Sequence, residues 1–268
     1  MIYDDFIDWL EERELSKNTV ECYKYALKQF FERYSEFNKH NLIQFKKELM
    51  ARWSPKTVSI RITALNEYAK FLEKPEIRVS RIRVQKKFYL ENVPNDEEYK
   101  ILIAFLKKHN KKFYWIVRFL AGTGCRVSEL IQIKKCDLSK GIVKLHSKGK
   151  ERTIMIPKNL IEDSKEFFEK KSENDFLFES QRFKQKAIST RGVDQVLRDL
   201  GMKAGIRKEV LHPHAFRHFF AIKMLKATNN DISLVSNYLG HSNIATTAIY
   251  TMRTLEEQEK QLNNSMTW

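Results

Sequence analysis

The sequence has few of the features that mark secreted, membrane or metal-binding proteins. Its three cysteines, Cys22, Cys125 and Cys136, are too few and too scattered for a disulfide framework or a cysteine-based zinc site. We expect each to be a small buried side chain. No apolar run approaches the roughly 18 residues that span a bilayer, and the first residues lack the features of a signal peptide. The expected setting is soluble, cytoplasmic and reducing.

Acidic residues are in deficit. The 268 residues include 49 lysines and arginines against 34 aspartates and glutamates, a formal net charge of +15. An excess of this size favours a polyanionic partner, most simply nucleic acid. An acidic membrane surface is the competing partner, and the absence of an apolar spanning run counts against it.

The spacing of apolar residues predicts a helical N-terminal domain over residues 1–73. From Val20 to Tyr34, apolar residues recur every three or four positions, which is the period of one helix face. Ser16 and Ser54 stand where helix N-caps are expected. Such a bundle alone could serve as a scaffold or as an interaction module.

Residues 74–93 interrupt the helical period and are strongly basic. A solvated linker and a line of contacts with DNA phosphates are compatible interpretations, because a basic tether would add sequence-independent affinity. Asn95 and Glu98 then predict a capping box, so a second domain is expected over residues 94–268. The basic side chains of the linker are Arg78, Arg81, Arg83, Lys86 and Lys87.

The second domain is expected to combine helices with one β-hairpin. Two β-branched runs, 142–145 and 153–156, flank Lys148-Gly149-Lys150, a pattern typical of a hairpin. The predicted fold class is therefore mainly α with a small β-sheet. Helices are predicted near 99–106, 113–120, 160–171, 190–204, 213–226 and 255–262.

Chemically versatile side chains gather between residues 212 and 250. His214 and Arg217 are three residues apart in a helical pattern, so they lie on one helix face. His241 follows Gly240, where that pattern predicts a helix end, and Tyr250 lies on the next short helix. This stretch is a candidate active site.

The stretch resembles the C-terminal motif of the tyrosine recombinases, with its His-x-x-Arg, Leu-Gly-His and terminal Tyr. Residues 122–130 are similar to the family's first arginine motif, and residues 147–152 resemble its lysine-bearing hairpin. Three motifs in the right order make the resemblance specific. It implies a helical core-binding domain and a mixed α/β catalytic domain, most similar to those of the Xer-type branch.

The resemblance implies a role for each motif residue. Tyr250 is the expected nucleophile, whose attack on a DNA phosphate gives a 3′-phosphotyrosyl ester and frees a 5′-hydroxyl. A phenol has a pKa of about 10, so it needs a base or nearby cations to react. Arg126 and Arg217 are expected to bind the non-bridging phosphate oxygens with their paired donors, and Glu129 to hold Arg126.

The resemblance also implies that a lysine and two histidines take part in proton transfer and hydrogen bonding. Lys148 is expected to be the general acid for the departing 5′-oxygen. Lys150 competes for that role, because the hairpin turn is one residue shorter than is usual in the family. His214 is expected to exchange a proton with Tyr250, and His241 to hydrogen-bond a non-bridging oxygen. Lys150 and Arg152 are also expected, with the basic linker, to contact DNA.

Neither a cofactor nor a metal is expected. The phosphotyrosyl ester keeps the bond energy, so rejoining needs no ATP, and the sequence has no Gly-x-x-x-x-Gly-Lys-Ser/Thr loop. A zinc site built from His212, His214 and His218 has no cysteine or carboxylate nearby to complete it. His212 and His218 are therefore expected to be structural.

The sequence thus predicts a site-specific DNA recombinase of the Xer type, which resolves chromosome or plasmid dimers. The resemblance implies double-stranded DNA with inverted half-sites as partner, and four protomers on two such sites, docked through the segment after Tyr250. The alternatives are an integrase or resolvase of a mobile element, a type IB topoisomerase-like enzyme and a non-catalytic DNA-binding protein of the same fold.

Overall fold

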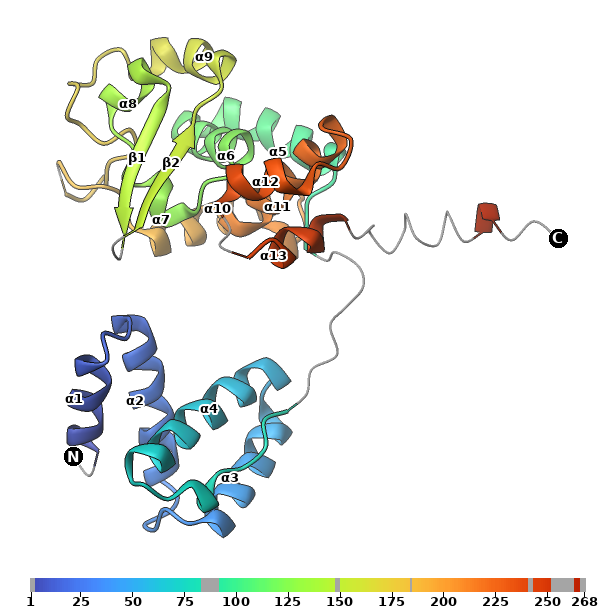
Figure 1. The fold of residues 1–268 in the computed structure, drawn as a ribbon. Coiled ribbons are helices and arrows are strands. Elements are labelled where there is room, and N and C mark those ends of the chain that lie inside the picture. Colours follow the sequence, from blue (N-terminus) through green and yellow to red (C-terminus); the bar gives the residue numbers. More distant parts are fainter. Residues whose placement is uncertain are drawn as a thin grey trace. The chain divides into compact units, whose positions relative to one another are not determined.

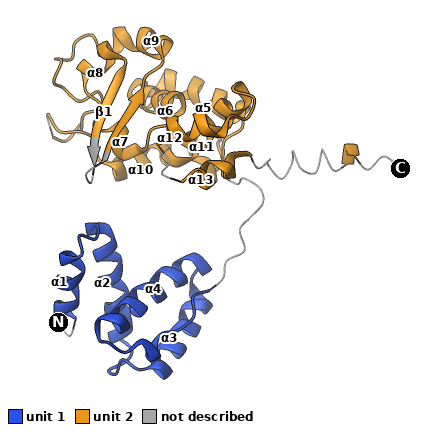
Figure 2. Ribbon diagram, viewed as in Figure 1, with its two compact units in different colours: residues 1–86 blue, residues 87–268 orange. Residues whose placement is uncertain are grey.

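The computed structural model describes residues 3–82, 92–147, 150–183, 185–240, 243–251 and 263–265, without the side chains of residues 146, 147 and 150. The chain divides into two compact units, residues 1–86 and 87–268, each with its own core (Figure 2). No helix among the described residues is long and apolar enough to cross a membrane.

The first unit is a bundle of helices around an aromatic core (Figure 1). Ser16 and Ser54 cap α2 and α4, as the sequence predicts, by accepting hydrogen bonds from the backbone N–H groups of Thr19 and Thr57. Phe30 is fully buried at its centre. The elements are α1 (Asp4–Glu12), α2 (Lys17–Phe31), α3 (Lys39–Arg52), α4 (Pro55–Phe71) and the 3-10 turn η1 (Pro75–Ile77).

The start of the predicted linker belongs to this first unit. Ile77 and Val79 are buried in its core. The Asn66 side chain also holds Val79, accepting from its N–H at 3.0 Å and donating to its carbonyl at 2.9 Å. Residues 75–79 therefore pack as part of the bundle and are not a solvated tether, while residues 83–91 lie outside the described residues.

The second unit is mainly helical with one antiparallel hairpin, as the sequence predicts. Val143 of β1 pairs with Ile154 of β2, and both side chains enter the core. The predicted helix 255–262 lies outside the described residues. The elements are α5 (Asp96–His109), α6 (Lys111–Thr123), α7 (Val127–Leu130), α8 (Lys135–Lys140), β1 (Ile142–Ser147), β2 (Lys150–Met155), α9 (Lys158–Phe168), α10 (Thr190–Lys203), η2 (Lys208–Val210), α11 (Pro213–Ala227), α12 (Ile232–Leu239), α13 (Ala245–Ala248) and η3 (Ile249–Thr251).

Two buried helices bring together the motifs of this second unit. α6 and α11 pack against each other, and α11 also contacts α12 and η3. The C-terminal end of α6, which leads into residues 124–130, therefore lies beside the helix that carries residues 213–227. Packing of these helices, rather than nearness in sequence, assembles the site.

The cysteines differ in burial. Cys125 is buried, and burial raises the pKa of its thiol to about 11. Cys22 is exposed and Cys136 is half-buried, so the expectation of a buried side chain was wrong for Cys22. Cys22 lies on α2, whose buried residues are Val20, Ala26, Leu27 and Phe30.

The predicted capping box at the start of α5 is present and is reinforced from a distant segment. The Asn95 side chain accepts from the N–H of Glu98, and the Glu98 carboxylate accepts from the N–H of Asn95. Arg207 adds a hydrogen bond of 2.6 Å from Nε to Glu98. Burial alone would raise the pKa of Glu98, but the hydrogen bonds from Arg207 and Asn95 outweigh it and hold that pKa below its ordinary value.

We predict that Glu98→Gln lowers the free energy of unfolding by about 1–2 kcal/mol at neutral pH, because an ionised acceptor is lost. A carboxylate with a depressed folded-state pKa stabilises the fold above its unfolded-state pKa, and this contribution disappears as the pH falls through the folded-state value. Urea unfolding at pH 7 and pH 3 should therefore show a difference from wild type that shrinks in acid.

Glu97→Gln is the matched control. Glu97 lies beside Glu98 in the first turn of α5, but its side chain is 77% exposed and pairs only with Lys100 among its described salt bridges. It should change stability by less than about 0.5 kcal/mol. Equal losses for the two variants would contradict the reinforced capping box.

Candidate active site

The first arginine motif forms a tight turn after α6. Gly124 ends that helix with a left-handed backbone, φ 63°, and Arg126 then begins α7. The Glu129 carboxylate accepts from the Arg126 backbone N–H at 2.7 Å and from its guanidinium Nη1 at 2.8 Å. One carboxylate thus fixes both the backbone and the side chain of Arg126, and that side chain stays 43% exposed.

A second arginine shares that carboxylate. Arg152 of β2 donates from Nη1 to the same Glu129 oxygen at 2.7 Å, and its side chain is only 14% exposed. Its Nη2 lies 3.5 Å from the carbonyl of Tyr238. Sequence analysis placed Arg152 among the DNA contacts, but in the structure its guanidinium faces inward and supports the Arg126 turn.

Arg217 lies at the centre of the site and is 1% exposed. Its Nη1 donates to the Gly124 carbonyl at 2.7 Å, and its Nη2 donates to the Leu239 carbonyl at 2.8 Å. These carbonyls belong to the C-terminal ends of α6 and α12, where the helix dipole favours a cation. The buried guanidinium therefore ties two helix ends together.

Burial and neighbouring positive charges disfavour the protonated form of Arg217. Desolvation, followed by the positive charges of Arg126 and Arg152, lowers the pKa of Arg217 to about 10. The guanidinium still carries its proton at neutral pH. A buried cation with two cationic neighbours is a site that favours an anion.

Tyr250, in η3, points its phenol at this centre. The residue is 6% exposed, and its hydroxyl hydrogen-bonds Arg217. Burial raises the pKa of Tyr250 above its ordinary value, although Arg217 and Arg126 act in the opposite direction. The structure thus brings together Arg126, Glu129, Arg217 and Tyr250 from three separate stretches of the chain.

The histidines of α11 differ in position. His212 caps the helix, with Nδ1 accepting from the N–H of Ala215 at 3.1 Å, which is a structural role. His214 is exposed, and its ring meets that of His218 edge-on at a centroid distance of 4.3 Å. His218, expected from the sequence to be structural, instead contacts the candidate site, with its Nδ1 2.8 Å from the Tyr250 hydroxyl.

A signal for His218 was present in the sequence. It follows His214 by four residues, and such pairs are neighbours on one face of a helix. The presence of His214 and Arg217 on that face made it the face of the site. The His-x-x-Arg motif of the family ends at Arg217, so it does not include His218.

Other expected site residues are only partly described. Lys148 and His241 lie outside the described residues, as do Arg83, Lys86 and Lys87, and the side chain of Lys150 is not described. Among the residues that the structure describes, no group of three or more His, Cys, Asp or Glu side chains is placed to hold a metal.

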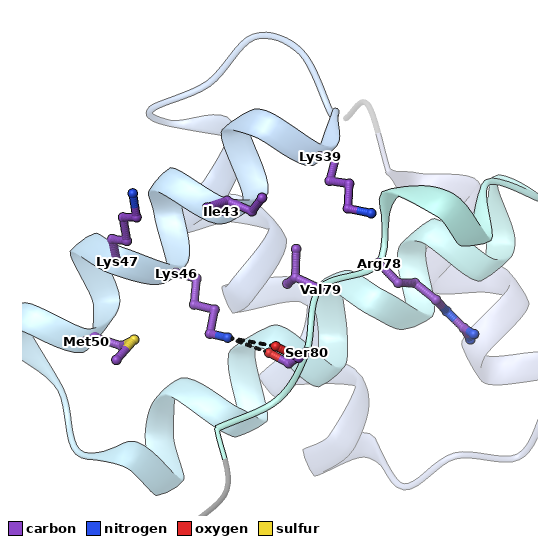
Figure 3. A pocket seen from close by; sticks show the side chains of 8 residues that line it. All are labelled: Lys39, Ile43, Lys46, Lys47, Met50, Arg78, Val79 and Ser80. Atoms are coloured by element: carbon purple, nitrogen blue, oxygen red, sulfur yellow. Dashed lines mark hydrogen bonds between the residues drawn. The ribbon is translucent and has the colours of Figure 1, made fainter.

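The exposed arginines at the start of the predicted linker belong to the first unit. Arg78 borders a groove of about 500 Å³ (Figure 3). Arg81, three residues later in the sequence, is also exposed. Lys46 donates to the Ser80 carbonyl at 2.7 Å across this groove. The groove combines basic side chains with an apolar floor, and its lining is Lys39, Ile43, Lys46, Lys47, Met50, Arg78, Val79 and Ser80.

Comparison with known proteins gives consistent matches along both units. Residues 93–257 match the phage integrase family, and residues 3–76 match the phage integrase N-terminal SAM-like domain. The tyrosine recombinase XerA of Pyrococcus furiosus is 32% identical over 273 residues, covering 98% of this chain and 93% of that protein. A tyrosine recombinase XerD of Staphylococcus epidermidis is 28% identical, covering 93% of each chain.

Comparison with solved structures also gives matches to recombinases and integrases. A crystal structure of XerA recombinase matches with a TM-score of 0.55 and 26% identity, covering 98% of this chain and 97% of that one. A lambda integrase tetramer bound to a Holliday junction matches with a TM-score of 0.72 at 14% identity, covering 92% of this chain and 75% of that one, a likeness of fold alone.

The packing of Arg152 under Gly240 can be tested through stability. We predict that Gly240→Ala costs about 1–3 kcal/mol more than Gly205→Ala in urea unfolding. Both glycines have a left-handed backbone, with φ 61° and 77°, so both variants carry a similar backbone strain. Only at Gly240 would the new Cβ lie 2.9 Å from Arg152 Nε, whereas Gly205 has nothing within 4 Å.

The double variant identifies the cause. In an Arg152→Ala background, the extra cost of Gly240→Ala should disappear, because the contacting side chain is gone. If the extra cost persists there, the strain has another origin and Arg152 does not occupy the space beneath Gly240.

Proposed function

The chain belongs to the phage integrase family, and on that premise we propose which of its residues carry out the reaction of a site-specific tyrosine recombinase. Recombination is of the Xer-like kind, and the Xer relatives that span nearly the whole chain disfavour the alternatives. One observation carries the assignment of residues: the buried phenol of Tyr250 lies against Arg217, in a site where Arg126 adds a second guanidinium.

Strand cleavage follows from this geometry. The Tyr250 oxygen attacks the scissile phosphorus, a Tyr–O–P bond forms, and the bond from phosphorus to the 5′-oxygen breaks. The phenolic proton passes to a base, and the departing oxygen takes a proton from Lys148, with Lys150 the competing donor. The 3′-phosphotyrosyl ester is then attacked by the 5′-hydroxyl of another strand, which reverses each proton transfer and releases Tyr250.

The arginines stabilise the charge of the transition state. Arg217 is held by two backbone carbonyls, so its position is set before DNA arrives. Arg126 presents a partly exposed guanidinium that Glu129 holds in one orientation. In this proposal the two bind the non-bridging oxygens, while His241 and the exposed His214 add hydrogen bonds to the phosphate.

DNA binding uses surfaces of both units. The basic groove and Arg78 and Arg81 of the first unit contribute phosphate contacts, as do Arg83, Lys86, Lys87 and Lys150. Arg152 is left out of this set because of its inward position. A XerH recombinase has been solved bound to its difH substrate, and lambda integrase as a tetramer on a Holliday junction.

By analogy with these complexes, we assign this chain a duplex with inverted half-sites and a tetramer on two such sites. Because its substrate is DNA and its relatives come from Pyrococcus and Staphylococcus, we place the reaction in the cytoplasm. Four protomers would supply one nucleophile for each of the four strands that two duplexes exchange.

The covalent step can be trapped directly. We predict that the wild-type protein forms a covalent complex with a nicked duplex, because the short 5′-strand diffuses away and prevents rejoining. The duplex should carry the inverted repeat that the protein protects on DNA from its own organism. Tyr250→Phe should bind this duplex with unchanged affinity and form no covalent complex on a denaturing gel. Trapping by the Phe variant would refute Tyr250 as nucleophile.

Arg126 offers a second test. Arg126→Gln should slow single-turnover cleavage about 10²–10³-fold at saturating protein, since one fixed charge at the transition state is lost. Arg198→Gln is the matched control, because Arg198 is also a partly exposed arginine in an i,i+3 or i,i+4 ion pair, with 46% exposure against 43%. Similar rates for the two variants would contradict the role of Arg126.

A further inference from the structure

His218 touches the reacting atom of the proposed mechanism. It lies on α11 next to Arg217, and its Nδ1 is 2.8 Å from the Tyr250 oxygen. Its ring is tilted by 52° to the phenol at a centroid distance of 5.2 Å, which places the nitrogen beside the hydroxyl rather than the two ring faces together. The contact therefore includes a hydrogen bond beside the tilted contact of the two rings.

Arg217 and His218 can use different parts of the Tyr250 hydroxyl. A guanidinium has only donors, so in its hydrogen bond with Arg217 the phenol oxygen is the acceptor. The phenolic O–H remains to be donated, and His218 Nδ1 lies at donating distance. In the tautomer with its proton on Nε2, His218 has a lone pair on Nδ1 and accepts this O–H.

Tyr250 also needs a proton acceptor within the protein. The residue is 6% exposed, so bulk water has little access to its hydroxyl. Burial outweighs the two arginines and leaves the phenol harder to ionise than in water. The cations of the site orient and stabilise charge, but they do not by themselves remove the proton.

We propose that His218 is the catalytic base that takes the phenolic proton of Tyr250 during cleavage and returns it during rejoining. The inference rests on the proposed function. As the O–P bond forms, the O–H bond breaks and the proton moves to Nδ1, giving an imidazolium. In the reverse step the Tyr–O–P bond breaks, and that imidazolium reprotonates the departing phenolate.

His214 takes a different part in this arrangement. It is exposed on the same helix face, and its ring edge contacts His218 from one turn away. This position suits a contact with the incoming phosphate and support of the His218 ring. The proton exchange that the sequence assigned to His214 therefore passes to its neighbour four residues later.

His218→Asn separates proton transfer from hydrogen bonding. The Asn side-chain oxygen can accept a hydrogen bond near the position of Nδ1 but cannot take a proton at neutral pH. We expect cleavage of the nicked duplex to slow by about 100-fold or more, with DNA affinity and thermal stability unchanged. Cleavage at the wild-type rate would overturn the proposal.

A substrate that bypasses tyrosine protonation supplies the decisive readout. At a DNA 3′-end esterified with 4-nitrophenol, a 5′-hydroxyl strand forms the new P–O bond and gives its proton to Lys148 or Lys150, as in the proposed rejoining step. The nitrophenolate departs without a proton. In a Tyr250→Ala background, which makes room for the nitrophenyl ring, His218→Asn should leave this joining rate unchanged. Arg126→Gln should slow it, because the phosphate is the same.

The outcomes are distinguishable. A His218→Asn protein that fails in cleavage and also slows the bypass reaction would show that His218 acts through the geometry of the site, and the base role would be wrong. Covalent trapping by Tyr250→Phe would instead refute the proposed function itself. Slow cleavage with an unchanged bypass rate supports the base.

Discussion

The site depends on one buried cation held by the ends of two helices. The Arg217 guanidinium donates to the carbonyls of Gly124 and Leu239, the residues at which α6 and α12 finish. Both helices end in a left-handed glycine, which leaves these carbonyls free to turn inward. The same contact fixes the turn that carries Arg126 and the turn that leads to residue 241. A substitution at Arg217 would therefore disturb the catalytic charge and its scaffold together.

Without DNA, the site holds positively charged arginine side chains close to one another. Arg126 and Arg152 share the Glu129 carboxylate, and both act to lower the pKa of Arg217. Burying like charges costs free energy that packing elsewhere in the unit must offset. A phosphate diester brings the missing negative charge, so binding the scissile group relieves a repulsion that the protein maintains. Preorganised charge of this kind needs no rearrangement when negative charge develops in the transition state.

Sequence reasoning was effective where a local rule determines structure. Capping residues such as Ser54 and Asn95 placed helix starts, and the β-branched runs placed the hairpin. It was less effective where the result depends on the direction in which a side chain points. In a chain with 49 basic residues, charge alone cannot show that Arg152 points inward to Glu129. The buried packing of Val79 and the role of His218 likewise depend on tertiary contacts, with Asn66 and Tyr250, that no local pattern contains.

Burial of Tyr250, the proposed nucleophile, would also control the reaction. The packing that holds the Tyr250 hydroxyl against Arg217 and His218 also keeps its proton in place, because desolvation penalises the phenolate. In the protein without DNA, the Tyr250 hydroxyl is therefore held in position but keeps its proton. In the proposed mechanism, a bound phosphate gives the Tyr250 oxygen an electrophile to attack at the moment the proton moves to its acceptor, so no free phenolate has to form. Bond making and proton transfer are thereby coupled, and a DNA end is created only when a tyrosyl ester is there to hold it.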